Sequence, residues 1–126
     1  SLPGSSLNAV RINRPIVSEG SMLEECTVES SIIGVRTSMT RATVRRSLVM
    51  GVDPYPPAGP AGGPPLGIGE GSLIEDAIVD KNARIGRNVR ITNKSGLAEA
   101  EGKGWAIRDG IVVVTKNAVI PDGTVI

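Results

Sequence analysis

The two segments Val79-Asp80-Lys81-Asn82-Ala83-Arg84-Ile85 and Val114-Thr115-Lys116-Asn117-Ala118-Val119-Ile120 repeat one pattern. Each begins and ends with an aliphatic residue, six positions apart, and carries Lys-Asn-Ala in the same phase between them. A period of six fits neither an α-helix nor a flat strand. It is the period of a parallel β-helix, in which each hexapeptide forms one side of a triangular coil. The repeat therefore predicts an all-β chain built as a parallel β-helix of hexapeptide repeats.

Aliphatic residues recur through the rest of the chain at steps of six or five. They fall at Val17, Leu23, Val28, Ile33, Met39, Val44 and Val49, then at Ile68, Ile74, Val79, Ile85 and Ile91, then at Val114, Ile120 and Ile126. Three hexapeptides make a coil of about 18 residues, so we expect about four to five coils. Hexapeptide coils are left-handed in known families, an exception to the usual right-handed crossover, and we expect that hand here.

Two segments interrupt this spacing and are expected to leave the coil as extruded loops. Residues 52–66 are so rich in proline and glycine that they cannot form ladder hydrogen bonds, and partial disorder is expected. Residues 93–110 contain Leu97-Ala98-Glu99-Ala100-Glu101, expected to form one helical turn, and Trp105, expected to cover an exposed coil face. Residues 1–126 are expected to form a single domain, with residues 1–15 as a linker leading into the coil.

The composition excludes several classes of function. The net charge of +1 provides no field for binding nucleic acid or a membrane, so neither is expected as a partner. The chain has no histidine, which hexapeptide acyltransferases need as a general base and the carbonic anhydrases of this fold need as zinc ligands. The lone Cys26 cannot form an internal disulfide and is expected near the coil interior. We therefore expect no catalytic residue and no metal site in this chain.

The two lysines of the repeat are the best candidates for a functional site. If residues 93–110 leave and return within the side that begins at Ile91, then Val114 starts the coil directly above Val79. Lys116 then lies over Lys81 at a strand spacing of about 4.8 Å. Such a pair repels only weakly in water and becomes favourable when an anion lies between the two ammonium groups. Hexapeptide repeats often carry exposed lysines merely for solubility, and spacing alone favours that interpretation over an anion site.

Neighbouring residues extend this candidate site. Asn82 and Asn117 follow the two lysines, and Arg84 lies two residues beyond Asn82. These three residues are expected to contribute to an anion site. Arg84, Arg87 and Arg90, at intervals of three, would suit a basic strip, but Glu75, Asp76 and Asp80 are equally able to neutralise it, so these arginines are interpreted mainly as a solvated face.

Several motifs resemble the C-terminal domain of ADP-glucose pyrophosphorylase (glucose-1-phosphate adenylyltransferase) of the plant, algal and cyanobacterial type. They are Ser31-Ile32-Ile33-Gly34-Val35-Arg36, Met50-Gly51-Val52-Asp53, Gly67-Ile68-Gly69, Asp80-Lys81-Asn82-Ala83-Arg84-Ile85-Gly86 and the C-terminal Lys116-Asn117-Ala118-Val119-Ile120-Pro121-Asp122-Gly123-Thr124-Val125-Ile126. The Lys116-Asn117-Ala118 sequence and the Ile107-Arg108-Asp109-Gly110-Ile111 segment resemble the large, regulatory type of subunit.

The resemblance implies a left-handed β-helix that follows a nucleotidyltransferase domain, which is absent from this chain; because Ser1 is not a methionine, we expect an excised boundary there. The whole enzyme makes ADP-glucose and diphosphate from ATP and glucose 1-phosphate for starch or glycogen synthesis. It uses Mg²⁺ with ATP in the catalytic domain, and no cofactor is expected in this domain. It acts as a tetramer in the plastid stroma, or in the cytoplasm of a cyanobacterium.

In that family the lysines that match Lys81 and Lys116 bind 3-phosphoglycerate and phosphate as effectors. The resemblance thus implies a regulatory and oligomerisation domain whose partners are its own catalytic domain and sister subunits. The alternative is a structural β-helix module that binds proteins and has no effector site.

Overall fold

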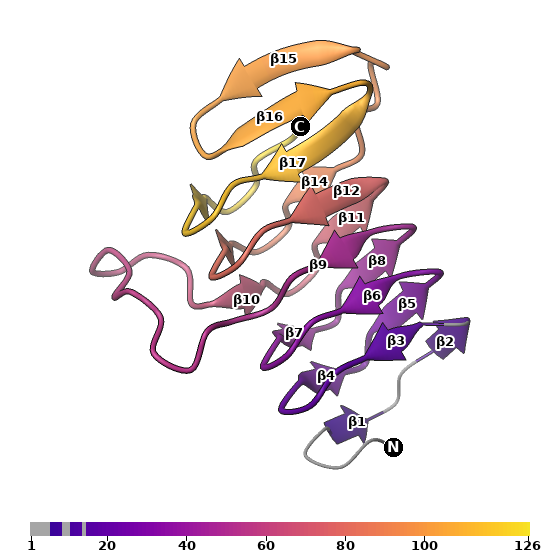
Figure 1. Cartoon of the computed structure of the whole chain (residues 1–126), viewed down its shortest axis with the longest axis vertical. Coiled ribbons are helices and arrows are strands. Elements are labelled where there is room, and N and C mark those ends of the chain that lie inside the picture. Colours follow the sequence, from indigo (N-terminus) through magenta and orange to yellow (C-terminus); the bar gives the residue numbers. More distant parts are fainter. Residues whose placement is uncertain (1–5, 9–10, 14) are drawn as a thin grey trace.

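The computed structural model describes residues 6–8, 11–13 and 15–126, with side chains from Pro15 onward, and all regular structure in this part is β-strand. The strands form three sheets along a single column (Figure 1). Sheet A contains β1 (Ser6–Asn8), β4 (Met22–Glu24), β7 (Ser38–Thr40), β10 (Gly67–Ile68), β13 (Arg84–Ile85) and β18 (Val119–Ile120). Sheet B contains β2 (Arg11–Asn13), β5 (Thr27–Glu29), β8 (Thr43–Arg45), β11 (Leu73–Glu75) and β14 (Arg90–Ile91). Sheet C contains β3 (Ile16–Val17), β6 (Ile32–Ile33), β9 (Leu48–Val49), β12 (Ala77–Val79), β17 (Ile111–Val114), β16 (Trp105–Arg108) and β15 (Glu99–Gly102).

Apart from β15 and β16, the strands visit sheets A, B and C in turn, and from β4 onward each pairs in parallel with the strand one coil earlier. This order makes five complete coils in the described part of the chain, and β18 begins a sixth. The structure therefore confirms a parallel β-helix with the expected number of coils. β1 and β2 already pair with β4 and β5, so the coil begins inside the residues expected to be a linker.

A coil without an inserted segment is shorter than the expected 18 residues. Leu23 pairs with Met39, 16 positions later, and Ile68 pairs with Ile85, 17 positions later. The reason is visible in the spacing, since the sides that begin at Leu23 and Val28 advance by five residues rather than six. At these corners a single residue with a positive φ turns the chain, such as Glu25 at φ 52°.

The core is a stack of aliphatic side chains inside the coil. Matching positions lie on top of one another, as in the column Met39, Ile68, Ile85 and Ile120 of sheet A. Ile85 and Ile120 have no exposed surface, and Cys26 is buried as expected, its thiol donating to the carbonyl of Met39. Burial raises the pKa of this thiol, so Cys26 is a packing residue and is not activated as a nucleophile.

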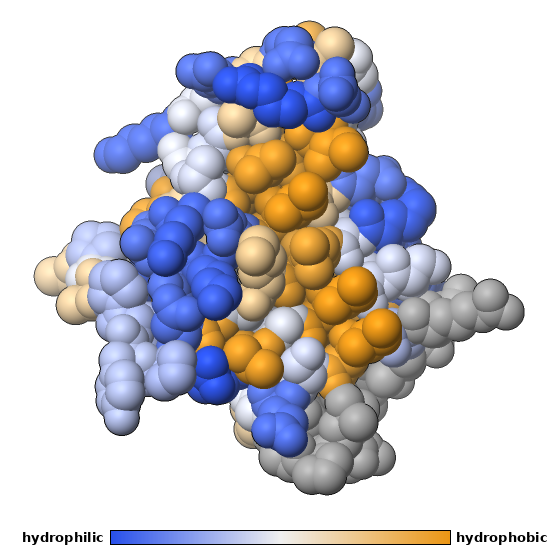
Figure 2. Space-filling view, viewed as in Figure 1, coloured by the Kyte–Doolittle hydropathy of each residue, from blue (hydrophilic) through white to orange (hydrophobic). Residues whose placement is uncertain are grey.

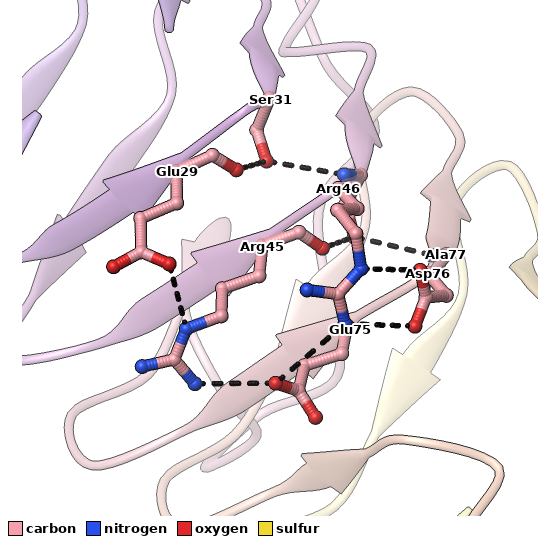
Figure 3. A network of polar contacts seen from close by, with 8 residues as sticks. Glu29, Ser31, Arg45, Arg46, Glu75, Asp76 and Ala77 are labelled. Atoms are coloured by element: carbon pink, nitrogen blue, oxygen red, sulfur yellow. Dashed lines mark hydrogen bonds and ion pairs between the residues drawn. The ribbon is translucent and has the colours of Figure 1, made fainter. Parts of the chain in front are cut away.

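Ion pairs and buried hydroxyls link the coils on the outside of sheet B and at its corner with sheet C (Figure 3). Arg45 of β8 donates to Glu29 of β5 at 3.0 Å and to Glu75 of β11 at 3.1 Å, which joins three coils. Arg46 donates to Asp76 at 2.8 Å, and this hydrogen bond lowers the pKa of the Asp76 carboxyl. These pairs lie at or near the surface, where an ion pair adds little to stability, so their main effect is to align neighbouring coils.

Residues 93–110 do not form an extruded loop with a helical turn, which corrects the expectation. β15 and β16 are antiparallel and continue sheet C beyond β17 (Figure 1). Trp105 lies on a strand, half-buried against the core, and Ile107 beside it is 2% exposed. The hairpin therefore extends the core past the last complete coil. None of the described residues forms a helix long and apolar enough to cross a membrane.

Candidate anion site at the corner between sheets C and A

The candidate site lies where β12 turns into β13, at the corner between sheets C and A. Val79 pairs with Val114, and the amide of Asp80 donates to the carbonyl of Val114 at 2.9 Å. In the turn that follows each of these strands, the two coils are also joined, because the backbone amide of Asn117 donates to the carbonyl of Lys81 at 2.9 Å. The expected register, with Val114 directly above Val79, is confirmed. The chain leaves the coil after β14 and re-enters it as β17, which pairs with β12. Lys116 therefore lies one coil above Lys81, and both side chains are exposed.

Asn82 and Asn117 stack beside the lysines and shape the turn. Both have φ 62°, a backbone conformation that asparagine adopts more readily than most residues. The side-chain amide of Asn82 donates to the side-chain oxygen of Asn117 at 3.0 Å. Asn82 is only 2% exposed, so its polar groups must all be used inside the protein. These bonds hold the two turns, and with them the two lysines, in register.

Asp53 completes this cluster, and it was missing from the residues expected from the sequence. Its carboxylate lies 3.4 Å from the ammonium of Lys81 and accepts a hydrogen bond from the amide of Asn82 at 2.9 Å. Its own N–H donates to the side-chain oxygen of Asn82 at 2.9 Å. The Asn82 bond is the main cause of a lowered pKa at Asp53, and the positive charges of Lys81 and Lys116 act in the same direction. Asp53 is thus ionised at neutral pH beside the lysine pair.

The sequence did contain a signal for Asp53. Val49 pairs with Val79, so counting forward in the same phase places Val52 below Asn82 and Asp53 below Ala83. That count runs into the proline-rich segment, where the hexapeptide pattern stops, and the carboxylate was therefore assigned to a free loop.

Arg84 has a different partner from the one expected. Its guanidinium donates to the carbonyl of Pro57 at 3.1 Å and to the carbonyl of Pro64 at 3.3 Å. Both acceptors lie in the segment that leaves the coil between β9 and β10 (Figure 1). In this structure Arg84 anchors the proline-rich loop to β13.

Arg84, Arg87 and Arg90 do not line up as a basic strip. Arg84 lies in sheet A and Arg90 in sheet B, while Arg87 lies in the turn between them, where it pairs with Asp122 at 3.9 Å. Residues three positions apart follow the chain around one coil, from one sheet to the next, and do not stack on one face along the coil axis. Glu75 and Asp76 do not neutralise this group, because they pair with Arg45 and Arg46.

The described residues contain no group of three or more acidic, cysteine or histidine side chains that could hold a metal ion. The corner contains the two exposed ammonium groups of Lys81 and Lys116 and the buried amide donor of Asn82. The carboxylate of Asp53 already contacts Lys81 and Asn82. Ammonium groups and amide donors are the kinds of group that proteins use to bind anions.

Short parallel strands, hexapeptide spacing and three sheets around an aliphatic core define a parallel β-helix domain. The chain matches the family model described as the GLGC left-handed parallel β-helix domain over residues 1–125. The chain belongs to this family, the C-terminal β-helix domain of the ADP-glucose pyrophosphorylases, which are nucleotidyltransferases. The match also confirms the expected left-handed coil.

Proposed function

We propose that this domain is the regulatory and oligomerisation domain of a glucose-1-phosphate adenylyltransferase, and that Lys81 and Lys116 bind an anionic effector. The enzyme would form ADP-glucose and diphosphate from ATP and glucose 1-phosphate. Its catalytic residues and its Mg²⁺ with ATP would belong to a nucleotidyltransferase domain outside this chain. The effectors proposed are 3-phosphoglycerate and phosphate, whose charge suits a pair of ammonium groups.

The observation that carries this proposal is the register of the two turns. Two lysines one strand spacing apart on a rigid coil present a fixed pair of charges, and the stacked asparagines prevent the two turns from sliding. An isolated surface lysine would provide no such geometry. Asn82 and Asn117 are positioning residues in this arrangement, and Arg84 contributes by holding the neighbouring loop.

Replacing Lys81 or Lys116 by alanine is expected to raise the concentration of 3-phosphoglycerate needed for half-maximal activation by about tenfold to a hundredfold, since each variant loses a charge-assisted contact. The measurement is ADP-glucose formation by the full-length protein in the assembly it forms, titrated with 3-phosphoglycerate and then with phosphate. Activity without effector should stay near that of the wild type.

Lys94→Ala is the matched control, because Lys94 is exposed and precedes the hairpin instead of lying in the stacked turns. Its effector response should equal that of the wild type. An unchanged response in both Lys81→Ala and Lys116→Ala would rule out the effector site and leave the domain as a structural module.

We further propose that the protein is a large-type subunit of the plant, algal and cyanobacterial branch, located in the plastid stroma, or in the cytoplasm if it is cyanobacterial. The support is that the sequences around Lys116 and Ile107 resemble those of large-type subunits. Fractionation of cells expressing the full-length protein tests the location, and recovery outside these compartments would contradict it.

The alternative role, a surface that binds protein, is favoured by an apolar stripe on the outer face of sheet C. Five outward side chains lie in register across it: Ile16, Ile32, Leu48, Ile78 and Val113. Ile16 is 60% exposed and Ile32 is 45% exposed. Figure 2 shows the stripe as a continuous hydrophobic band over β17, β12, β9, β6 and β3. A band of this extent is typical of an interaction surface. We propose the catalytic domain of the same enzyme subunit as its main partner, with sister subunits of a tetramer as further partners.

Replacing Ile32 by glutamate is expected to loosen this contact in the full-length protein, because an unpaired carboxylate would have to be buried in an apolar interface. Hydrogen–deuterium exchange on β6 and β9 should become faster by about tenfold or more. A factor of ten corresponds to about 1.4 kcal/mol of lost protection free energy. The control is Met22→Glu, a residue 55% exposed on sheet A. Equal protection in the two variants would show that the stripe is not covered.

A further inference from the structure

We propose that Asp53 is an internal counter-ion of the lysine pair, and that an incoming anion binds only by displacing its carboxylate. The inference rests on the proposed effector site and concerns its regulation. It assigns to the proline-rich loop a role that opposes effector binding.

The geometry shows that Asp53 uses the same groups that an anion would need. One carboxylate oxygen lies 3.4 Å from the ammonium of Lys81, and the other accepts from the buried amide of Asn82 at 2.9 Å. A phosphate between Lys81 and Lys116 would use the Lys81 ammonium and would gain from the same amide donor. Two anions cannot share these donors without strong repulsion, so the carboxylate and the ligand exclude each other.

Asp53 is held at this position by the residue before it. The amide of Val52 donates to the carbonyl of Val35 at 2.9 Å, and the carbonyl of Val52 accepts from Arg36 at 2.8 Å. Both polar backbone groups of Val52 are therefore fixed, and Asp53 follows it directly. On the far side, Arg84 holds the loop by the carbonyls of Pro57 and Pro64. The carboxylate is thus a tethered competitor whose local concentration does not change with dilution.

Displacement needs only a local movement. The Asp53 side chain is 34% exposed and can rotate toward solvent, which breaks its bond with Asn82 and its ion pair with Lys81. The backbone bond from Asp53 to Asn82 remains, and so do the Arg84 contacts with the loop. The donor on Asn82 that is released then becomes available to the ligand.

Asp53→Asn is expected to lower the half-activating concentration of 3-phosphoglycerate by about two- to fivefold, the range that corresponds to the loss of one exposed ion pair. The dissociation constant of inorganic phosphate, measured by calorimetry on the full-length protein, should fall by a similar factor. Asparagine has nearly the same shape as aspartate, and circular dichroism checks that the fold is kept.

Two further variants separate a direct contact from a general change in charge. Asp76→Asn changes the net charge equally, but Asp76 pairs with Arg46 at the corner between sheets B and C, so the response should stay at the wild-type value. In a Lys81→Ala background, Asp53→Asn should lose most of its effect, because the pair that it breaks no longer exists.

The outcomes distinguish this inference from the proposed function. If Asp53→Asn responds like the wild type, or more weakly, while Lys81→Ala and Lys116→Ala still lose the response, the counter-ion role is wrong and the effector site stands. If neither lysine variant changes the response, both proposals are wrong. A two- to fivefold gain confined to Asp53→Asn and dependent on Lys81 supports the counter-ion role.

Discussion

Replacing Ile74 by alanine is expected to lower the free energy of unfolding by about 2–5 kcal/mol, the usual cost of emptying a buried isoleucine site. Ile74 has no exposed surface and lies in register between Val44 and Ile91. A coil with three flat sides is a narrow prism, and each layer is filled by a few aliphatic side chains. Because the backbone ladders above and below hold the sides apart, the layer cannot collapse to refill the space.

The measurement is urea unfolding followed by circular dichroism, with the midpoint and slope compared with those of the wild type. Leu73→Ala is the control within the same strand, since Leu73 points outward and is only half-buried. Its cost should be about 1 kcal/mol or less. Equal losses at Leu73 and Ile74 would mean that inward and outward positions of β11 are not distinguished as the structure shows.

Replacing Gly67 by alanine is expected to cost about 3 kcal/mol or more, because two effects add. Gly67 has φ 102°, outside the region that residues with a side chain favour, which alone costs roughly 1–2 kcal/mol. A Cβ at this position would lie 2.2 Å from the carbonyl oxygen of Ser38, a backbone atom of the neighbouring coil. Sheet A would have to open at the point where the proline-rich loop re-enters it at β10.

Gly62→Ala is the matched control, in the loop that precedes β10. Gly62 has φ 74°, but a Cβ there would have no neighbour within 4 Å, so only the backbone penalty of about 1 kcal/mol remains. Thermal unfolding of the two variants gives the difference directly. A loss at Gly67 no larger than that at Gly62 would show that the coils are not packed as tightly at this point as the structure describes.

The coil itself could be predicted from local sequence, because each inward residue is marked by its own position in the hexapeptide period. Val79, Ile85 and Ile91 needed no knowledge of distant contacts to be assigned to the core, and all three are buried. The coil length was overestimated because every side was counted as six residues, although some sides have five and turn on a single residue at positive φ.

The helical turn expected at Leu97-Ala98-Glu99-Ala100-Glu101 was wrong because local preference lost to tertiary pairing. Alanine and glutamate favour a helix, yet Glu99 and Glu101 project outward to Arg108 while Ala100 packs against the core. The alternation of Glu99, Ala100 and Glu101 was a signal for a strand. It was too short to outweigh composition.

The sequence by itself determined the architecture and the equal phase of Lys81 and Lys116, since both follow from a period that each hexapeptide carries locally. Only the tertiary structure decided that the two lysines stack, because the register depends on where the hairpin of β15 and β16 returns to the coil. It also decided that Asp53 reaches Lys81 and that Arg84 is committed to the proline-rich loop. Those contacts are made by a segment without periodicity, whose path is determined by hydrogen bonds to distant residues and is not encoded by its own pattern.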